Sequence, residues 1–408
     1  MALAIGKRIC QRAFSTSPYT SPYFPKSFPQ DDFSRVREGN LLRFCELCLT
    51  KAGARTEHAR AVARVLVEAD MRAVYSHGIN RLKMYVDECK TGTVDVSAEP
   101  VVEKERGPTA VVNGNNVLGA VCGEFSMKLA IDKAKEHGIG WVVANNSNHY
   151  GIAGHYAMMA LEEGYIGMSL TNTSPIVVPT RGKNAALGTN PIAVAAPSTD
   201  PAEPFVLDMA SSAVALGQVE VVNRKGEKLP LGWSMDREGR PTDDATSAVQ
   251  SSTTGEGGLT PLGGMEVTSG YKGYGLGMMV EVLCGVLSGA NFGRKIRTWQ
   301  SPLLSREGEG EDDGEGANLG QCFVAIDPSA FAPGFPERVT DLVKQMRDLP
   351  SGAGQPRVMV PGEPELNARR EQDAKGIRLH ESLIRNLDQL SEELSVPRIE
   401  IEIEVEDY

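Results

Sequence analysis

The sequence predicts an α/β fold, and three observations support this prediction. Strand-like and helix-like segments alternate between about residue 110 and residue 209, which is typical of α/β proteins. The chain has 408 residues, of which 41% are hydrophobic and 23% charged, so it suits a large core and two domains. Helix-like segments lie on both sides of the alternating region, which predicts helical N- and C-terminal parts.

The part of the chain before the alternating region is predicted to be helical. Apolar residues recur with helical spacing from Arg35 to about Lys90. Gly53 marks a stop, and a second helix is expected from Glu57 to Asp70. These helices lead into a polar segment.

That segment reads VYSHGINRLKMYVDECKTG, from Val74 to Gly92. If it is helical, His77 and Arg81 share one face, because residues four apart are neighbours on a helix. Imidazole exchanges a proton near neutral pH, and guanidinium binds carboxylate through two hydrogen bonds. The pair therefore suits a small substrate with a hydroxyl or carbonyl beside a carboxylate. The alternative is a surface helix with polar residues.

The alternating region and the segments after it predict a series of strands and helices. In order they are a strand at Ala110–Val112, a turn at Asn115, a helix at Gly123–His137, a strand at Gly140–Ala144, a helix at Ile152–Glu163, strands at Tyr165–Leu170 and Phe205–Met209, a helix at Gly275–Leu287 and a strand at Cys322–Asp327. A long amphipathic region follows.

The division of the chain is predicted from these elements and from shifts in composition. We expect a targeting-like extension (1–30), a helical substrate-side region (31–110), an α/β cofactor-binding core (111–300), an acidic insert (305–318), a C-terminal region that packs back on the substrate side (319–395) and a tail (396–408). The insert, SREGEGEDDGEGAN, has too few apolar residues to fold and is expected to be a mobile loop. The tail, RIEIEIEVEDY, alternates Ile and Glu, so it is expected to be an edge strand or an exposed segment.

The first thirty residues contain Lys7, Arg8, Arg12 and Lys26, several serines and no acidic residue. This composition is typical of a mitochondrial transit peptide. The alternative is a disordered extension on a cytoplasmic protein.

Charge and cysteine content narrow the class of partner. A net charge of -11 and a pI near 5.2 argue against nucleic acid or an anionic membrane as the main partner, because clustered Lys and Arg hold both. There is no run of eighteen apolar residues, so no membrane span is expected. The seven cysteines are interpreted as scattered, with no paired spacing and no C-x-x-C pair, so they are expected to be reduced thiols inside a cell.

Three further motifs bear on chemistry. No G-x-G-x-x-G fingerprint is present, and GYKGYGLG (Gly270–Gly277) has a different glycine spacing. It still offers backbone N–H groups and Lys272 for a phosphate, or it is only a flexible entry to a helix.

The motif NNSNHYGIAGH (Asn145–His155) follows a predicted strand, where α/β proteins place ligands. No carboxylate has metal-ligand spacing with His149 and His155, so no metal is expected. The run from Thr171 to Ser198 makes turns or lines a pocket.

Taken together, the motifs resemble the malate/L-lactate dehydrogenase family of the second type, with ureidoglycolate, sulfolactate, diketogulonate and piperideine-carboxylate relatives. The resemblance extends from about Phe33 to Leu390. Its carriers are SHGINRLKMY (Ser76), NNSNHYGIAGHYA (Asn145), TNTSP (Thr171), LGTNPIAVAAP (Leu187), VLDMASSAVALGQV (Val206), LGWSMDREGRPTDD (Leu231), GYKGYGLGMMVEVL (Gly270) and VPGEPE (Val360).

The resemblance implies an NAD(P)-dependent oxidoreductase with a non-Rossmann nucleotide-binding region, acting on a 2-hydroxy acid such as malate, lactate or sulfolactate. NAD is the expected cofactor, with NADP open, and a homodimer is the expected assembly. The implied catalytic residues are Ser76, His77, Arg81 and His149, with His77 as first choice for the proton carrier. The implied cofactor-binding residues are Thr173, Ser174, Leu207, Asp208, Met209, Lys272, Gly362 and Glu363.

The sequence departs from the family pattern around the glycine-rich motif. The stretch GGMEVTSGYKGYGL has extra residues, and Tyr271 stands where the family usually has His. This departure and the acidic insert raise the alternative of a non-catalytic binding protein on the same scaffold. A metal-dependent hydrolase using His149 and His155 is a third hypothesis.

Overall fold

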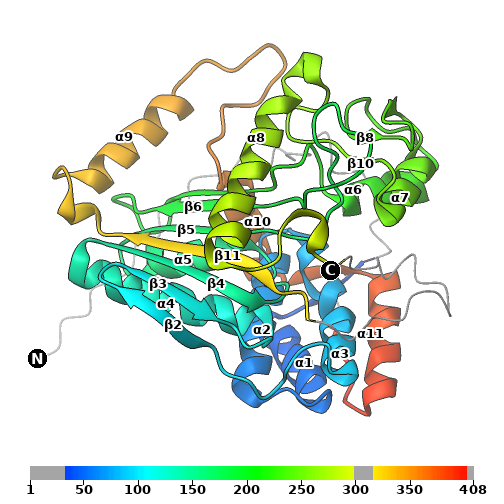
Figure 1. The fold of residues 1–408 in the computed structure, drawn as a ribbon, viewed down its shortest axis with the longest axis horizontal. Helices are drawn as coiled ribbons and strands as arrows, with labels where there is room; N and C mark the ends of the chain where they lie inside the picture. The colour runs from blue at the N-terminus through cyan, green and yellow to red at the C-terminus, as the bar shows by residue number, and fades with distance from the viewer. Residues whose placement is uncertain (1–32, 298–315, 402–408) are drawn as a thin grey trace, which may run out of the picture.

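The computed structural model describes residues 33–297 and 316–401. The predicted N-terminal extension, most of the acidic insert and the last residues of the tail lie outside the described residues. Figure 1 shows a central sheet with helices on both of its faces.

The helices are α1 (Glu38–Lys51), α2 (Thr56–Met71), α3 (Leu82–Thr91), α4 (Gly119–His137), α5 (Ala153–Glu162), α6 (Leu216–Arg224), α7 (Ala245–Thr254), α8 (Gly270–Glu281), α9 (Phe335–Arg347), α10 (Glu363–Lys375) and α11 (Glu381–Leu394). The strands are β1 (Phe33–Val36), β2 (Val101–Arg106), β3 (Thr109–Asn113), β4 (Ile139–Ser147), β5 (Ile166–Thr171), β6 (Ile192–Ala196), β7 (Phe205–Met209), β8 (Ser234–Met235), β9 (Pro241–Thr242), β10 (Gly258–Leu259), β11 (Leu319–Ile326) and β12 (Ile377–His380).

The main sheet has seven strands in the order β2-β3-β4-β11-β5-β6-β7. Strands β3 and β4 are parallel, and the other described neighbours are antiparallel. Strand β11 is buried along almost its whole length and pairs with β4 on one side and β5 on the other. This mixed sheet differs from the parallel sheet of a Rossmann fold, as expected from the missing fingerprint.

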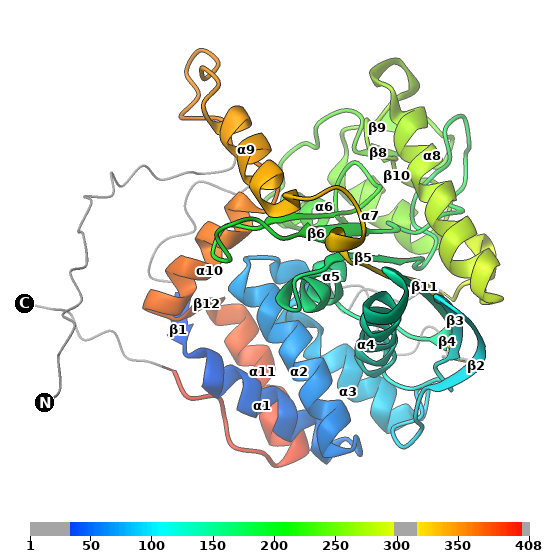
Figure 2. The same ribbon diagram turned by 90° about the vertical axis from the view of Figure 1, so that its left-hand side faces the viewer.

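Helices cover the two faces of the sheet differently. Helices α4 and α5 lie on one face together with the N-terminal helices (Figure 2). Their close approach depends on glycine: a Cβ at Gly140 of β4 would lie 2.0 Å from the Ala130 carbonyl oxygen, and one at Gly167 of β5 would lie 2.1 Å from that of Ala157. On the other face, Val280 and Cys284 pack on the sheet at the end of α8.

The C-terminal part returns to the N-terminal helices. Strand β12 pairs antiparallel with β1, and Phe33 lies opposite His380. The buried face of α11, with Ile384, Leu387 and Leu390, joins the same core as α1 and α2. A short third sheet of β10, β8 and β9 lies beside α6 and α7.

Most predicted elements are confirmed, with small differences at their ends. The strand at Phe205–Met209 is found with the predicted bounds, and the predicted helix at Gly275–Leu287 begins earlier, at Gly270, and continues after Glu281 as a π-helical turn, Val282–Val286. Sequence analysis did not recognise β6, because its short apolar run lies among turn-forming residues. The described start of the tail, up to Ile401, forms no strand.

One prediction is wrong. The segment from Val74 is not a continuous α-helix: two 3₁₀ turns, Tyr75–His77 and Ile79–Arg81, precede α3. Between them Gly78 is extended, with φ -84° and ψ -151°. The buried carboxylate of Asp70 causes this break, because it accepts a hydrogen bond from the Ile79 N–H at 2.7 Å.

The expectation that the sequence contains no C-x-x-C pair is also wrong. Cys45 and Cys48 do have C-x-x-C spacing, on α1. Both are buried and unpaired, and burial raises the pKa of the Cys48 thiol to about 12. Neither thiol is therefore suited to redox exchange. Across the described residues, we find no helix with the length and apolar character needed to cross a membrane.

Candidate active site

The two 3₁₀ turns bring three of the predicted site residues together. The Arg81 side chain folds back, and its Nε donates a hydrogen bond to the Ser76 carbonyl oxygen at 2.8 Å. The Ser76 hydroxyl lies 2.9 Å from Nδ1 of His77. Because Gly78 breaks the helix, these contacts replace the shared helical face that the sequence predicted. The side chains of Ser76, His77 and Arg81 are half-buried.

A second imidazole reaches the same place from the sheet. His149 follows β4 and is half-buried. Its ring stacks on that of His77, with a centroid distance of 5.7 Å and an interplanar angle of 14°. The structure therefore places His149 beside the Ser76–Arg81 turns, although the two segments are about seventy residues apart in the sequence.

Tyr85 holds the ring of His149. Its hydroxyl lies 2.6 Å from Nδ1 of His149, and its side chain is buried. The Gly151 N–H also points to this Nδ1, at 3.4 Å. Burial raises the pKa of Tyr85 well above its usual value, so the hydroxyl stays protonated and can donate to the imidazole or accept from it.

Both imidazoles are neutral at physiological pH. Burial, followed by the charge of Arg81, lowers the pKa of His77 to about 4. Burial also lowers the pKa of His149, and the nearby His77 and Arg81 act in the same direction. A bound anion can therefore exchange a proton with either neutral imidazole. Arg81 keeps its charge during this exchange and continues to attract the anion.

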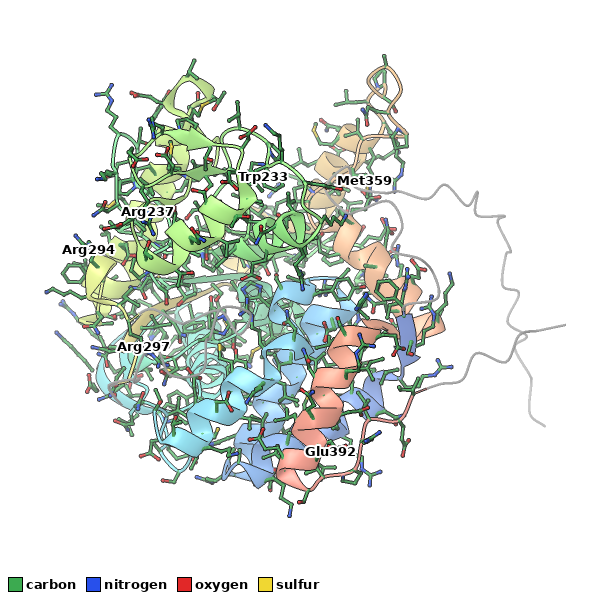
Figure 3. The ribbon with its side chains drawn as sticks, turned by 90° about the vertical axis from the view of Figure 1, so that its right-hand side faces the viewer. Trp233, Arg237, Arg294, Arg297, Met359 and Glu392 are labelled. Atoms are coloured by element: carbon green, nitrogen blue, oxygen red, sulfur yellow. The ribbon has the colours of Figure 1, made fainter. Side chains whose placement is uncertain are left out.

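The predicted cofactor-binding residues lie at the ends of neighbouring strands. Thr173 and Ser174 follow β5. The Thr173 N–H donates to Oδ1 of Asn190 at 3.1 Å. Ser174 is buried and its hydroxyl donates to the Arg297 carbonyl oxygen at 2.8 Å. Figure 3 labels Arg297, which follows α8 in the chain.

Leu207, Asp208 and Met209 lie on the edge strand β7, paired with β6. The Asp208 carboxylate accepts a hydrogen bond from the Gly154 N–H, at the start of α5, at 2.8 Å. Desolvation raises the pKa of this carboxyl group to about 6. Asp208 thus connects the strand to the loop that carries His149.

The other three residues predicted to bind the cofactor lie in different environments. Lys272 is exposed in the first turn of α8. Gly362 has φ 84° and lies against β7, since a Cβ there would be 2.4 Å from the Val206 carbonyl oxygen. The Glu363 carboxylate is buried and paired with Arg347 and Arg357. It is therefore committed to contacts within the protein.

The geometry does not bring His155 to His149. His155 lies on α5, and its Nε2 is 3.7 Å from Oε1 of Glu124. Glu124 in turn forms a two-oxygen ion pair with Arg64. Among the residues that the structure describes, no three His, Cys, Asp or Glu side chains form a group suited to a metal ion.

Sequence analysis missed two residues that build the site. Tyr85 was inside the quoted motif, but an apolar-faced aromatic in a helix is usually a core residue, and only the fold shows that it contacts His149. Asp70 was taken as the end of a helix, although an acid just before a Ser-His-Gly turn is a suitable capping group.

Paired imidazoles beside an arginine suit the chemistry of a 2-hydroxy acid dehydrogenase. The family model described as malate/L-lactate dehydrogenase matches residues 36–388. The chain therefore belongs to the malate/L-lactate dehydrogenase family, as its motifs predicted. The comparisons give no support to the non-catalytic alternative.

Several relatives are similar over most of their length. Malate dehydrogenase from Pyrococcus horikoshii is 40% identical over 376 residues, which cover 91% of this chain and 99% of the relative. Malate/(S)-sulfolactate dehydrogenase from Methanothermus fervidus is 37% identical, covering 85% and 94%. The crystal structure of malate dehydrogenase from Entamoeba histolytica matches with a TM-score of 0.82 and 35% identity, over 90% of this chain and 99% of that chain.

The names of two more distant relatives include the cofactor. Ureidoglycolate dehydrogenase (NAD(+)) from Escherichia coli is 31% identical, covering 86% of this chain and 95% of the relative. (2R)-3-sulfolactate dehydrogenase (NADP(+)) from Chromohalobacter salexigens is 31% identical, covering 83% and 92%. Relatives of this chain thus use one or the other nicotinamide cofactor.

Proposed function

We propose that the chain transfers a hydride between NAD(P) and a small 2-hydroxy acid or 2-oxo acid, with malate, lactate or sulfolactate as the substrate type. The observation that carries this proposal is the stacked pair of His77 and His149 beside Arg81. One cation and two neutral proton carriers match a substrate with a carboxylate next to a hydroxyl or carbonyl.

Arg81 is the group proposed to bind the substrate carboxylate. Its Nε is held by the Ser76 carbonyl oxygen, which fixes the plane of the guanidinium while its terminal nitrogens remain to donate. A planar guanidinium binds a carboxylate through two parallel hydrogen bonds. This contact orients the adjacent carbon of the substrate toward the imidazoles.

The proton is proposed to move at Nε2 of one imidazole. His77 is held by the half-buried Ser76 hydroxyl of the adjacent residue, whereas His149 is held at Nδ1 by the buried Tyr85 hydroxyl of a different element. The structure thus favours His149 over His77, the sequence-based first choice. If Tyr85 accepts from Nδ1, Nε2 takes the proton of a hydroxy acid; if Tyr85 donates, the Nε2 N–H faces the carbonyl of an oxo acid.

The residues around β5, β7 and α8 fit a nicotinamide dinucleotide in their chemistry. The exposed Lys272 lies in the first turn of α8, and a cation at a helix N-terminus suits a diphosphate. Asp208 and the backbone around Thr173 supply polar groups suited to the ribose and amide. When bound, the cofactor supplies the hydride chemistry, and the protein supplies orientation and the proton.

We further propose NAD as the preferred cofactor, with NADP as the alternative. Relative turnover with NADH and NADPH decides this point: a higher kcat/KM with NADPH would reject the preference.

We also propose that the chain is divided into the regions that the sequence predicts. Ser76, His77 and Arg81 come from region 31–110, and region 319–395 packs back on it through β12 and α11. Region 111–300 supplies most of the cofactor-binding residues. Strand β11 belongs to the central sheet, so the sheet draws strands from both sides of the acidic insert.

We also propose a homodimer, with the exposed face of α8 and the π-helical turn as its interface. This face crosses the front of the molecule in Figure 1. Its exposed apolar side chains are Tyr271, Met278, Met279, Val282, Val286 and Leu287. A patch of this kind indicates a protein contact. Light scattering should give twice the chain mass, and Val282→Glu with Val286→Glu should give monomers; a monomeric unsubstituted protein would reject the dimer.

Three substitutions test the proposed chemistry. Arg81→Met should raise the KM for the oxo acid by roughly 10- to 100-fold, because a charge-assisted contact is lost. His149→Ala should lower kcat by about 10²- to 10⁴-fold, and His77→Ala should lower it less. All three should keep NADH affinity. If His77→Ala is the slower enzyme, the proton belongs to His77; if no substitution matters, the proposed site is wrong.

A further inference from the structure

A buried carboxylate outside the catalytic cluster links three segments of the fold. Glu281 is the last residue of α8 and is 4% exposed. Its Oε2 accepts from the Asn172 side chain at 3.0 Å and from the Gly293 N–H at 3.3 Å, and its Oε1 accepts from the Asn190 side chain at 3.0 Å. No lysine or arginine among the described residues pairs with it. A buried carboxylate without a cation depends on such charge-assisted hydrogen bonds.

The two amides pass this contact on to the proposed cofactor-binding segment. Oδ1 of Asn190 accepts from the Thr173 N–H at 3.1 Å. Asn172 directly precedes Thr173, and its Oδ1 accepts from the Gly320 N–H of β11 at 2.9 Å. The Asn190 side chain also donates to the Gly277 carbonyl oxygen of α8 at 3.1 Å. Each amide therefore has one orientation that satisfies both of its ends, and the carboxylate stabilises it together with backbone partners, which for the Asn172 NH₂ group include the Asn291 carbonyl oxygen at 2.8 Å.

The helix geometry at this point is unusual and independent of the hydrogen bonds. Directly after Glu281, α8 changes to a π-helical turn, and such turns occur often at functional sites. The turn packs tightly on the network: a Cβ at Gly285 would lie 2.7 Å from Nδ2 of Asn172, and one at Gly320 would lie 2.5 Å from the Cys284 carbonyl oxygen. The end of α8 is thus fixed against the start of the Thr173–Ser174 segment.

We infer that Glu281 is a positioning residue for the cofactor, which sets Thr173 and Ser174 relative to α8 and its Lys272. This inference rests on the proposed function, because these residues are proposed to contact the nucleotide. The carboxylate is suited to the role because both of its oxygens accept hydrogen bonds. A glutamine would turn an NH₂ group toward one of the asparagine NH₂ groups, which would place two donors against each other and remove one charge-assisted hydrogen bond.

The test compares Glu281→Gln, Glu281→Asp and the control Glu124→Gln. Glu124 is a buried carboxylate of similar exposure, 7%, and is paired with Arg64 in another part of the molecule. Calorimetric titration with NADH and with NADPH measures Kd, steady-state kinetics measures kcat at saturating cofactor, and urea unfolding measures stability.

Glu281→Gln should raise the Kd for the preferred cofactor by about 10- to 100-fold, the usual effect of losing hydrogen bonds to a charged group. Its kcat at saturating cofactor should change by less than about threefold, because Arg81 and the imidazoles are untouched. Glu281→Asp should recover part of the affinity. Glu124→Gln should lose stability and keep the cofactor Kd within about twofold.

Unchanged affinity in Glu281→Gln would overturn the inference, and so would an equal loss of affinity in Glu124→Gln. If Glu281→Gln does not fold, Asn190→Asp replaces it: this change keeps the acceptor for the Thr173 N–H and loses the donor to Glu281 and to the Gly277 carbonyl oxygen. Failure of both variants to fold would also overturn the inference, because the network would then serve folding. If the unsubstituted protein binds neither NADH nor NADPH, the proposed function fails first.

Discussion

Tyr85→Phe removes one oxygen from the interior of the site and leaves the aromatic ring in place. The oxygen lies 2.6 Å from Nδ1 of His149. A neutral hydrogen bond contributes about 0.5–1.5 kcal/mol, and leaving a buried partner unsatisfied costs about 1–3 kcal/mol. The Gly151 N–H remains near Nδ1 at 3.4 Å, so the ring keeps one weak contact. We expect a loss of about 1–2 kcal/mol in transition-state stabilisation, or about 5- to 30-fold in kcat/KM.

The assay follows consumption of the reduced cofactor at saturating cofactor and over a range of 2-oxo acid concentrations, which gives kcat/KM. Tyr156→Phe is the matched control, because the Tyr156 hydroxyl is also buried and donates a 2.6 Å hydrogen bond, to the Tyr150 carbonyl oxygen. It should lower stability and leave kcat/KM within about twofold. Equal kcat/KM for Tyr85→Phe and the unsubstituted protein would refute the role of Tyr85 in orienting His149. An equal loss in both variants would refute it as well.

Three other outcomes are expected. The pKa of His77 is lowered to about 4, below the value near 6.5 of an unfolded histidine. Between these two pH values the unfolded chain binds more protons, so the folded protein loses stability as the pH falls. Urea unfolding at pH values above and below this range should show a smaller loss of stability for His77→Gln than for the unsubstituted protein. An equal loss would contradict the lowered pKa. Deletion of residues 305–315 should leave the urea midpoint nearly unchanged, because Ile296 and Ala317 already pack together on either side of the insert; loss of soluble protein would show that the insert is structural. A fluorescent fusion of residues 1–40 should enter mitochondria because of its basic, acid-free start; a diffuse cytosolic signal would reject the transit peptide.

The sequence was informative where local pattern and tertiary structure agree. The helices around Leu41 and from Glu57 onward follow a helical apolar repeat, and β7 is an apolar strand between turns, so their periodicity predicts them. The motif residues Ser76, His77, Arg81 and His149 were also predicted as members of one site, and the structure does bring them together.

The remaining features depend on contacts between distant parts of the chain. The helical spacing of His77 and Arg81 was the wrong geometric reason for their proximity, because the Asp70 carboxylate breaks the helix at Gly78. Tyr85 and Glu281 looked like ordinary helix residues. Only the packing of α3 against the β4 loop, and of α8 against the end of β5, shows what these two side chains contact.

The most direct test of the central claim is the turnover of the purified protein with a panel of 2-oxo acids, oxaloacetate, pyruvate and sulfopyruvate, each with NADH and with NADPH. The account predicts that at least one pair is consumed, with one 2-hydroxy acid formed for each reduced cofactor oxidised. Cofactor binding without turnover of any 2-oxo acid on the panel would contradict it.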